Sequence, residues 1–279
     1  MNLLAVIVAY HPDHSTLVSN IEKIIEEVEH LVVYKNSEIS IQSSIVERFG
    51  DKIDFIGSEK NVGISKALND AIIWAKGKDF THILTLDQDS FFKEGHLARF
   101  RSLVDENVTN LNVGVYVPNY INRGSLCSKS NDLFEEVEMS ITSGSIIELS
   151  LFDRVGGFNE VLFIDAVDND FCYRIKAEFD LSTVLFPSIL LVHELGYMTK
   201  TRFGFYTMNY SAFRTYYIVR NNIYLWRKYP EFYHYKLRKL LIKDYIIYRV
   251  IKVLIAESDK FRKIKSIILG VYHGIFMRL

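Results

Sequence analysis

Apolar residues along the first half of the chain alternate between short continuous runs and stripes at helical spacing. The continuous runs, which are typical of buried strands, occupy residues 3–9, 31–34, 53–56, 83–86 and 113–118. Apolar residues recur at helical spacing over 15–30 and 64–75, and Gly77 suits the end of the second helix. Strands that alternate with helices predict a doubly wound, mainly parallel α/β sheet with right-handed crossovers and flanking helices.

The pattern becomes mixed after residue 120. Residues 141–147 read as a strand in which Gly144 allows a close approach of the backbone. A short helix is predicted over 168–178, and a last strand over 182–192. We therefore expect the sheet to continue to about residue 200.

A basic helical tail follows the predicted sheet, so we expect two parts, residues 1–205 and residues 206–279. Beyond Pro230, basic residues outnumber acidic ones, and apolar residues fill the gaps at roughly helical spacing. Three roles remain open for this amphipathic tail: a packed helical subdomain, a homo-oligomer interface, or contact with an anionic membrane surface. We expect no nucleic-acid partner, since no recognised motif accompanies the charge.

Composition limits the remaining choices. The chain has 279 residues, 49% of them hydrophobic, with a net charge of −1, which suits one large domain or a domain with an appendage. Cys127 and Cys172 give neither a disulfide framework nor metal-knuckle spacing, as in a reducing compartment. Residues 1–9 resemble a core strand more than a signal peptide, and no apolar run reaches membrane-spanning length. We therefore expect a cytoplasmic protein, with at most peripheral attachment at the inner face of the membrane.

Two carboxylates follow the buried run at 83–86. Asp87 and Asp89 stand one residue apart, at what would be the carboxyl edge of the sheet, where open α/β sheets bind ligands. Their mutual repulsion is offset when a cation lies between them, and hard oxygen ligands favour Mg²⁺ or Mn²⁺. We therefore expect Asp87 and Asp89 to hold a divalent metal against the diphosphate of a nucleotide-sugar.

Seven sequence blocks, in order along the chain, resemble the family 2 inverting glycosyltransferases, which have the GT-A fold. They occupy residues 8–12, 61–69, 86–90, 142–145, 156–160, 163–174 and 193–196. Arg220-Asn221-Asn222 also resembles a segment in the helices that follow the catalytic domain of these enzymes. Within the family the chain looks most like bacterial rhamnosyltransferases.

The resemblance implies a donor site at the carboxyl edge of the sheet. Ala9 and Tyr10 would place backbone groups near the nucleotide base, although a plain strand-to-helix turn is the competing reading. Asn61 and Gly63 would open a helix toward the nucleotide, against the alternative that Asn61 only caps that helix. Ser143 and Gly144 would lie near the donor sugar or the acceptor.

The resemblance also assigns the metal ligands. Asp89 would bind Mn²⁺ or Mg²⁺, and Asp87 would lie near both the ribose and the ion. In some relatives a histidine at the position of His193 completes the metal shell; a core or hydrogen-bonded histidine is the alternative.

A third carboxylate would act as the catalytic base in a single displacement that inverts the anomeric configuration. Asp168 matches the second acid of the Glu-Asp motif of the family, although Val167 replaces the glutamate. It would take the proton of the acceptor hydroxyl. Asp170 and Asp165 are rivals, and the whole acidic group could instead complement a helix dipole.

One departure leaves the donor base open. Lys35 lies where relatives carry Asp-Asn-x-Ser, and lysine cannot accept a hydrogen bond. We expect a dTDP- or UDP-linked sugar donor, with rhamnose favoured, and a saccharide or lipid-linked saccharide acceptor in bacterial surface polysaccharide or O-antigen synthesis. A UDP-hexose donor is the alternative. A nucleotidyltransferase is less favoured, because no Gly-rich basic loop follows the first strand. A sugar-nucleotide binding module without catalysis is the third choice.

Overall fold

The structure is a computed structural model that describes all residues except 107, 110, 194–198, 202–203, 205 and 279. The chain forms two compact units. One contains Met1–Glu160 and Phe171–Leu195, and the other contains Val161–Asp170 and Gly196–Leu279. The division into residues 1–205 and 206–279 stays a prediction about domains.

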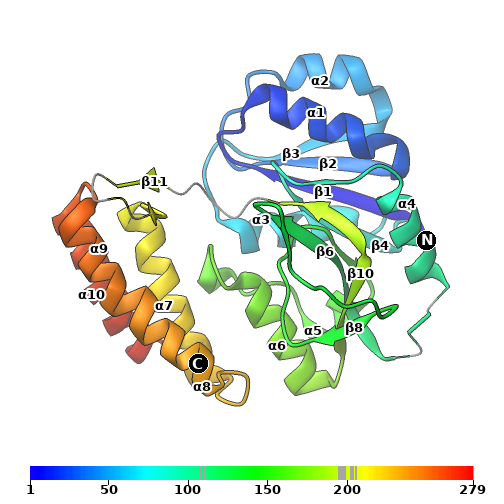
Figure 1. The fold of residues 1–279 in the computed structure, drawn as a ribbon. Helices are drawn as coiled ribbons and strands as arrows, with labels where there is room; N and C mark the ends of the chain where they lie inside the picture. Colours follow the sequence, from blue (N-terminus) through cyan, green and yellow to red (C-terminus); the bar gives the residue numbers. More distant parts are fainter. Residues whose placement is uncertain (107, 110, 194–198, 202–203, 205, 279) are drawn as a thin grey trace. The chain divides into compact units, whose positions relative to one another are not determined.

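A ten-stranded mixed sheet forms the centre of the first unit (Figure 1). Its strands are β1 (Leu3–Ala9), β2 (His30–Lys35), β3 (Ile53–Gly57), β4 (His82–Asp87), β5 (Phe91–Phe92), β6 (Val113–Asn122), β7 (Ser125–Leu126), β8 (Glu135–Val137), β9 (Ser145–Glu148) and β10 (Ser182–Val192). The order is β3-β2-β1-β4-β9-β6-β10-β5, with β7 beside β6 and β8 beside β10. Strands β3, β2, β1 and β4 are parallel, and so are β6 and β10.

Strand β9 interrupts the parallel arrangement, because it runs antiparallel to both β4 and β6. The predicted strand over 141–147 begins only at Ser145. Gly144 turns the chain there with a φ of +84°. A Cβ on this glycine would lie 2.7 Å from Cγ of Pro118, so the turn needs a residue without a side chain.

Helices cover both faces of the sheet. They are α1 (His14–Ile24) with the 3₁₀ turn η1 (Ile25–Glu27), α2 (Gln42–Phe49) with η2 (Gly50–Lys52), α3 (Ile64–Ala75), α4 (His96–Asp105) and α5 (Leu151–Val155). The 3₁₀ turn η3 (Glu160–Leu162) and helix α6 (Val167–Phe179) each contain residues of both units. Helix α1 ends earlier than the predicted helix over 15–30, because the chain changes to η1 and then enters β2 at His30. Helices α2, α4 and α5 were not predicted.

The sequence of β1 explains why helices lie on both faces. Leu3, Ala5 and Ile7 share one buried core cluster with Leu17 of α1 and Phe100 of α4. The alternate residues of the strand, Leu4 and Val6, point to the opposite face and are also buried. A strand that is apolar at every position thus needs cover on both sides, and α3 supplies it on the second face (Figure 1).

The second unit is mainly helical, as predicted for the end of the chain. Its elements are β11 (Thr199–Lys200), β12 (Tyr206–Thr207), α7 (Ala212–Lys228), α8 (Tyr235–Leu240), the π-helix η4 (Leu241–Ile247), α9 (Tyr248–Ala256) and α10 (Lys260–Phe276). Gly270 and Gly274 let α10 lie close to α7, since a Cβ on either glycine would lie 3.0 Å or less from α7 atoms. Among the described residues, no helix combines the length and the apolar character that crossing a membrane requires.

Candidate active site

Three potential metal ligands converge at the carboxyl ends of two strands. Asp87 is the last residue of β4, Asp89 lies in the turn that follows, and His193 comes directly after β10. One ligand atom from each side chain lies within 4.8 Å of the other two. The fold thus brings together residues more than 100 positions apart, which the family resemblance grouped as possible metal ligands.

His193 is held in place from two sides. Its Nδ1 atom lies 2.6 Å from Oγ of Ser90 and 3.7 Å from Oδ2 of Asp87. The ring is 5% exposed and meets the ring of Tyr120 edge to face. His193 is therefore both a hydrogen-bonded buried histidine and a member of the carboxylate cluster, so the two readings of this residue are compatible.

Ser143 and Gly144 fix the end of β4. Ser143 Oγ accepts a hydrogen bond from the backbone N–H of Asp87 at 3.0 Å. Gly144 N–H donates to the carbonyl of Thr85 at 2.6 Å, and the Thr85 hydroxyl donates to the carbonyl of Thr142 at 2.6 Å. The structure therefore places Ser143 and Gly144 against the strand that carries the first carboxylate.

Ala9 and Tyr10 reach the same edge of the sheet. The Tyr10 N–H donates to Oε1 of Gln88, the residue between the two aspartates, at 2.7 Å. The carbonyl of Gln88 accepts a hydrogen bond from Nδ2 of Asn20 at 2.8 Å. These bonds join the end of β1 and helix α1 to the Asp87–Asp89 turn, while the side chain of Tyr10 stays 46% exposed.

Asn61 precedes helix α3 but does not cap it, contrary to the alternative drawn from the sequence. The N-cap is Gly63, with a φ of +85°, and Asn61 Oδ1 accepts the Gly63 N–H at 3.0 Å. The Val62 N–H donates to Oδ1 of Asn36, whose own N–H donates to the carbonyl of Ala9. Asn36 therefore connects the end of β1 to the start of α3.

The segment with the departure at Lys35 is built into the same edge. Lys35 pairs with Ala9 in the register of β1 and β2, and Ser37 Oγ accepts the N–H of His11 at 2.8 Å. The Tyr34 hydroxyl donates to Asp70 of α3 at 2.8 Å. Burial and this carboxylate raise the pKa of Tyr34, so its hydroxyl stays protonated and donates to Asp70.

The acidic segment at the start of α6 belongs to the second unit. Asp170 is fully buried and pairs with Nζ of Lys228 at 3.2 Å. Asp165 accepts a forked interaction from the Arg214 guanidinium, with Nη2 at 2.9 Å from Oδ1. Burial raises the pKa of the Asp165 carboxyl, and the Arg214 charge opposes that shift. Both rivals of Asp168 thus have cationic partners that explain their presence.

Asp168 lies in the first turn of α6 and is partly exposed. Its Oδ1 accepts a hydrogen bond from the N–H of Asn169 at 2.9 Å. Asn221, from the Arg220-Asn221-Asn222 segment, holds the loop before α6 through hydrogen bonds to the carbonyls of Ile164 and Asp165. The assignment of Asp168 as the base stays a prediction.

Three residues at the sheet edge were not assigned roles from the sequence: Ser90, Gln88 and Asn20. Asn20 could have been noticed in the sequence, because it is a polar residue on the apolar face of a helix, and that face is buried. Ser90 and Gln88 had only their position within the Asp-Gln-Asp-Ser block. Of the last resembling block, only His193 belongs to the described residues, and positions 194–196 lie outside them.

The cluster fits a divalent cation of the kind predicted. Two carboxylates and one imidazole nitrogen form a hard, mostly oxygen donor set, which suits Mn²⁺ or Mg²⁺ better than soft metals. Within the cluster, the Asp87 and Asp89 carboxylates repel each other, and a cation between them would offset this repulsion. Asp87, Asp89 and His193 are the residues that would hold the ion.

Comparisons with known proteins agree with this fold. The dTDP-rhamnosyl transferase RfbF of Shigella flexneri is 27% identical over 292 residues, which cover 98% of this chain and 95% of that protein. The crystal structure of S. aureus TarS 1–349 with UDP-GlcNAc is similar, with a TM-score of 0.57 and 16% identity, over 99% of this chain and 73% of that one.

A structure of GalNAc-T7 with UDP, GalNAc and Mn²⁺ is also similar, with a TM-score of 0.59 and 12% identity over 88% of this chain. The chain spans 55% of that longer protein. These likenesses confirm the predicted GT-A fold with C-terminal helices. The family model for glycosyl transferase family 2 matches residues 5–152, which is more than half of the chain. The chain therefore belongs to glycosyl transferase family 2.

Proposed function

We propose that this glycosyltransferase moves a rhamnosyl group from a dTDP-linked donor to a hydroxyl of a saccharide or lipid-linked saccharide, in the synthesis of a bacterial surface polysaccharide. The convergence of Asp87, Asp89 and His193 at the end of β4 carries the proposal. A full-length relative named as a dTDP-rhamnosyl transferase supports rhamnose and dTDP. A UDP-linked hexose is the second candidate, because a structure with the same fold holds UDP-GlcNAc.

Binding of the donor would use the sheet edge assembled around β1 and β4. Asp89, Asp87 and His193 would hold Mn²⁺ or Mg²⁺, which supplies positive charge to the diphosphate as it leaves. The start of α3, at Gly63, offers backbone N–H groups that suit a nucleotide phosphate. Ala9, Tyr10 and Asn61 would border the nucleoside, and Ser143 with Gly144 would border the sugar.

The transfer itself is a single displacement at the anomeric carbon. The acceptor oxygen forms the new bond to that carbon while the bond from the carbon to the diphosphate oxygen breaks. The nucleoside diphosphate departs, and the acceptor proton passes to the carboxylate of Asp168. Attack from the face opposite the leaving group inverts the anomeric configuration.

A panel of sugar nucleotides tests the proposal. The full-length protein would be mixed with dTDP-rhamnose, UDP-glucose, UDP-GlcNAc or GDP-mannose in the presence of Mn²⁺, and donor hydrolysis and thermal unfolding would be followed. We expect dTDP-rhamnose to raise the unfolding temperature most, because a ligand that binds only the native state stabilises it. A larger shift with UDP-GlcNAc would favour the second candidate. No shift and no hydrolysis with any donor would contradict sugar-nucleotide transfer.

A further inference from the structure

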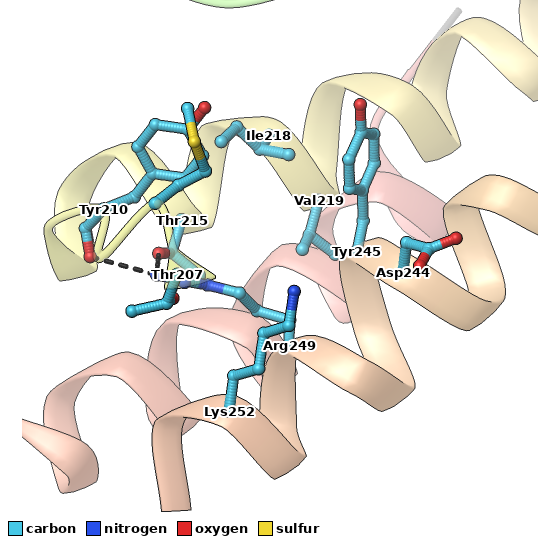
Figure 2. Close-up of a pocket in the computed structure, with 10 residues that line it drawn as sticks. Thr207, Tyr210, Thr215, Ile218, Val219, Asp244, Tyr245, Arg249 and Lys252 are labelled. Carbon is cyan, nitrogen blue, oxygen red and sulfur yellow. Dashed lines mark hydrogen bonds between the residues drawn. The ribbon is translucent and has the colours of Figure 1, made fainter. Parts of the chain in front are cut away.

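A cavity of about 280 Å³ lies within the second unit, and none of its lining residues has been assigned a role above. Figure 2 shows that it is bounded by α7, the π-helix η4, α9 and the β12 segment. Its walls differ in character: Arg249 and Lys252 supply charge, whereas Ile218 and Val219 of α7 supply an apolar surface. The cavity is near the low end of the range of small-molecule sites, about 300–1,000 Å³.

The charged wall holds a buried cluster with more positive than negative charge. Arg249 Nη1 lies 2.6 Å from Oε1 of Glu257, and Lys263 Nζ lies 2.9 Å from Oε2 of the same carboxylate. All three residues are less than 10% exposed. One carboxylate thus serves two buried cations, which leaves one positive charge without a counter-charge inside the cluster.

Arg249 forms further hydrogen bonds in this cluster, but not all of its N–H donors are paired. Its Nη2 donates to the Tyr210 carbonyl and to Oγ1 of Thr215, both at 3.1 Å. Its Nε is buried and has no hydrogen-bond partner among the described residues. An unsatisfied donor of this kind on a buried guanidinium is costly.

Lys252 adds a second charge at the cavity itself. Its side chain extends from α9 toward the space between Thr215 and Tyr245 (Figure 2). Among the described residues it forms no ion pair, including with Asp244, the acidic residue of the lining. Burial raises the pKa of Tyr245, so its hydroxyl stays neutral. The polar wall therefore suits an anion.

The surface of α9, like the α7 side of the cavity, carries apolar side chains. Ile251, Leu254 and Ile255 of this helix are 44%, 54% and 44% exposed. Such a helix, with Arg249 and Lys252 between its apolar positions, suits an amphiphile better than a fully hydrated ion. A ligand with one anionic group and an attached hydrocarbon chain would match both walls.

We propose that this cavity binds the phosphate of a lipid phosphate, with the phosphate oxygens at Arg249 and Lys252 and the start of the chain along Ile218 and Val219. Because the cavity is small, only the phosphate and the first carbons would enter it. The inference deepens the proposed function and rests on it in one respect: the sugar acceptor would be carried on such a lipid phosphate.

Calorimetric titration of the full-length protein with farnesyl phosphate tests the site directly, without any donor. Two variants remove one wall each: Lys252→Ala removes the charge, and Ile218→Trp fills the apolar side. The matched control is Lys265→Ala, an exposed lysine of α10 outside the lining. We expect Lys252→Ala to weaken binding at least tenfold, Ile218→Trp to abolish it, and Lys265→Ala to leave it unchanged.

Three further probes identify the recognised group. Equal affinity for farnesol would overturn a role for the phosphate, and equal affinity for inorganic phosphate would overturn a role for the chain. Tighter binding to phosphatidylglycerol vesicles than to farnesyl phosphate would assign the site to membrane headgroups and overturn the acceptor assignment. Binding of dTDP in the same samples separates the two claims, since it depends on the Asp87–Asp89 edge and stays unchanged in Lys252→Ala.

Discussion

The Ser90 hydroxyl lies 2.6 Å from Nδ1 of His193, in a buried contact that joins the turn after β4 to the end of β10. This contact restricts the orientation of the imidazole ring, whose Nδ1 also lies 3.7 Å from Oδ2 of Asp87. Partners that orient a metal-binding histidine typically contribute 10- to 100-fold to metal affinity. Ser90 is therefore expected to tune the site although it is not one of the proposed ligands.

Replacing Ser90 with alanine should weaken Mn²⁺ binding by about 10- to 100-fold, since the ring loses its orientation while the three ligands remain. Mn²⁺ binding would be measured by electron paramagnetic resonance titration. Ser102→Ala is the matched control, because the Ser102 hydroxyl donates to the carbonyl of Ala98 in its own helix. Unaltered Mn²⁺ affinity in Ser90→Ala would mean that the contact with His193 has no part in metal binding.

Asp168→Asn should lower the rate of transfer on the order of 100- to 10,000-fold, because the amide cannot accept the acceptor proton. Donor affinity should stay within about twofold, since Asp168 is not among the residues proposed to bind the donor. Steady-state kinetics with the preferred donor and equilibrium binding of dTDP would measure the two effects separately. Normal turnover by Asp168→Asn would remove this residue from the role of base.

Asp170→Asn distinguishes the structural role of Asp170 from the catalytic role proposed for Asp168. Removing one partner of a buried ion pair typically costs about 3–5 kcal/mol, because the other charge stays buried without compensation. Because Asp170 pairs with Lys228, Asp170→Asn should lower the free energy of unfolding, measured in urea, by this amount. Asp168→Asn should change that free energy much less. The reverse ranking would contradict the roles assigned to the two aspartates.

The sequence predicted the elements whose pattern is local. Strand β1 is continuous and apolar because both of its faces are covered, and α3 has one apolar stripe and no breaker, so both were predicted with their observed ends. The Asp87–Asp89 turn followed from its place after a buried strand. These features depend on periodicity and on chain neighbours, which the sequence displays.

Features that depend on distant partners were not predictable in this way. Strand β9 lies antiparallel between β4 and β6, and its start is set by contacts of Gly144 with Pro118 rather than by its own composition. Ser90 and Gln88 act through His193 and Tyr10, which the fold brings near but the sequence does not. Resemblance to a family, not local pattern, was what pointed to His193.

Gly144→Ala should destabilise the protein by about 3 kcal/mol, because the new methyl group would press on Pro118 and on Leu191, 3.0 Å away. Gly124→Ala is the matched control: this glycine also has a positive φ, of +76°, but nothing lies within 4 Å of its added Cβ. Backbone strain alone should cost about 1 kcal/mol there. Urea unfolding measures both, and equal losses would show that the close approach at Gly144 is unimportant.

Asp13 should make stability depend on pH at the start of α1. The Ser15 hydroxyl and the Thr16 N–H hold the pKa of this N-cap carboxyl at about 2, below its ordinary value of 3.8. Since the folded-state pKa is the lower one, its contribution is present above about pH 4 and is lost as the pH falls toward 2. Wild type should therefore exceed Asp13→Asn in stability at pH 6, and the difference should shrink by pH 3.

Chemical unfolding at the two pH values tests this, with Asp51→Asn as the control for an exposed aspartate that caps no helix. A difference between wild type and Asp13→Asn that stays the same from pH 6 to pH 3 would show that the charge of the cap is not what stabilises α1.

The central claim is that the Asp87–Asp89 turn binds a divalent cation and, through it, a nucleoside diphosphate. Calorimetric titration of dTDP into the wild type and into Asp89→Ala, each with Mn²⁺ and with a chelator, tests it most directly, with Asp51→Ala as the control. We predict that Mn²⁺ strengthens dTDP binding at least tenfold in the wild type and the control, and that this gain disappears in Asp89→Ala. Equal dTDP affinity in all conditions, or an undiminished Mn²⁺ effect in Asp89→Ala, would contradict the account.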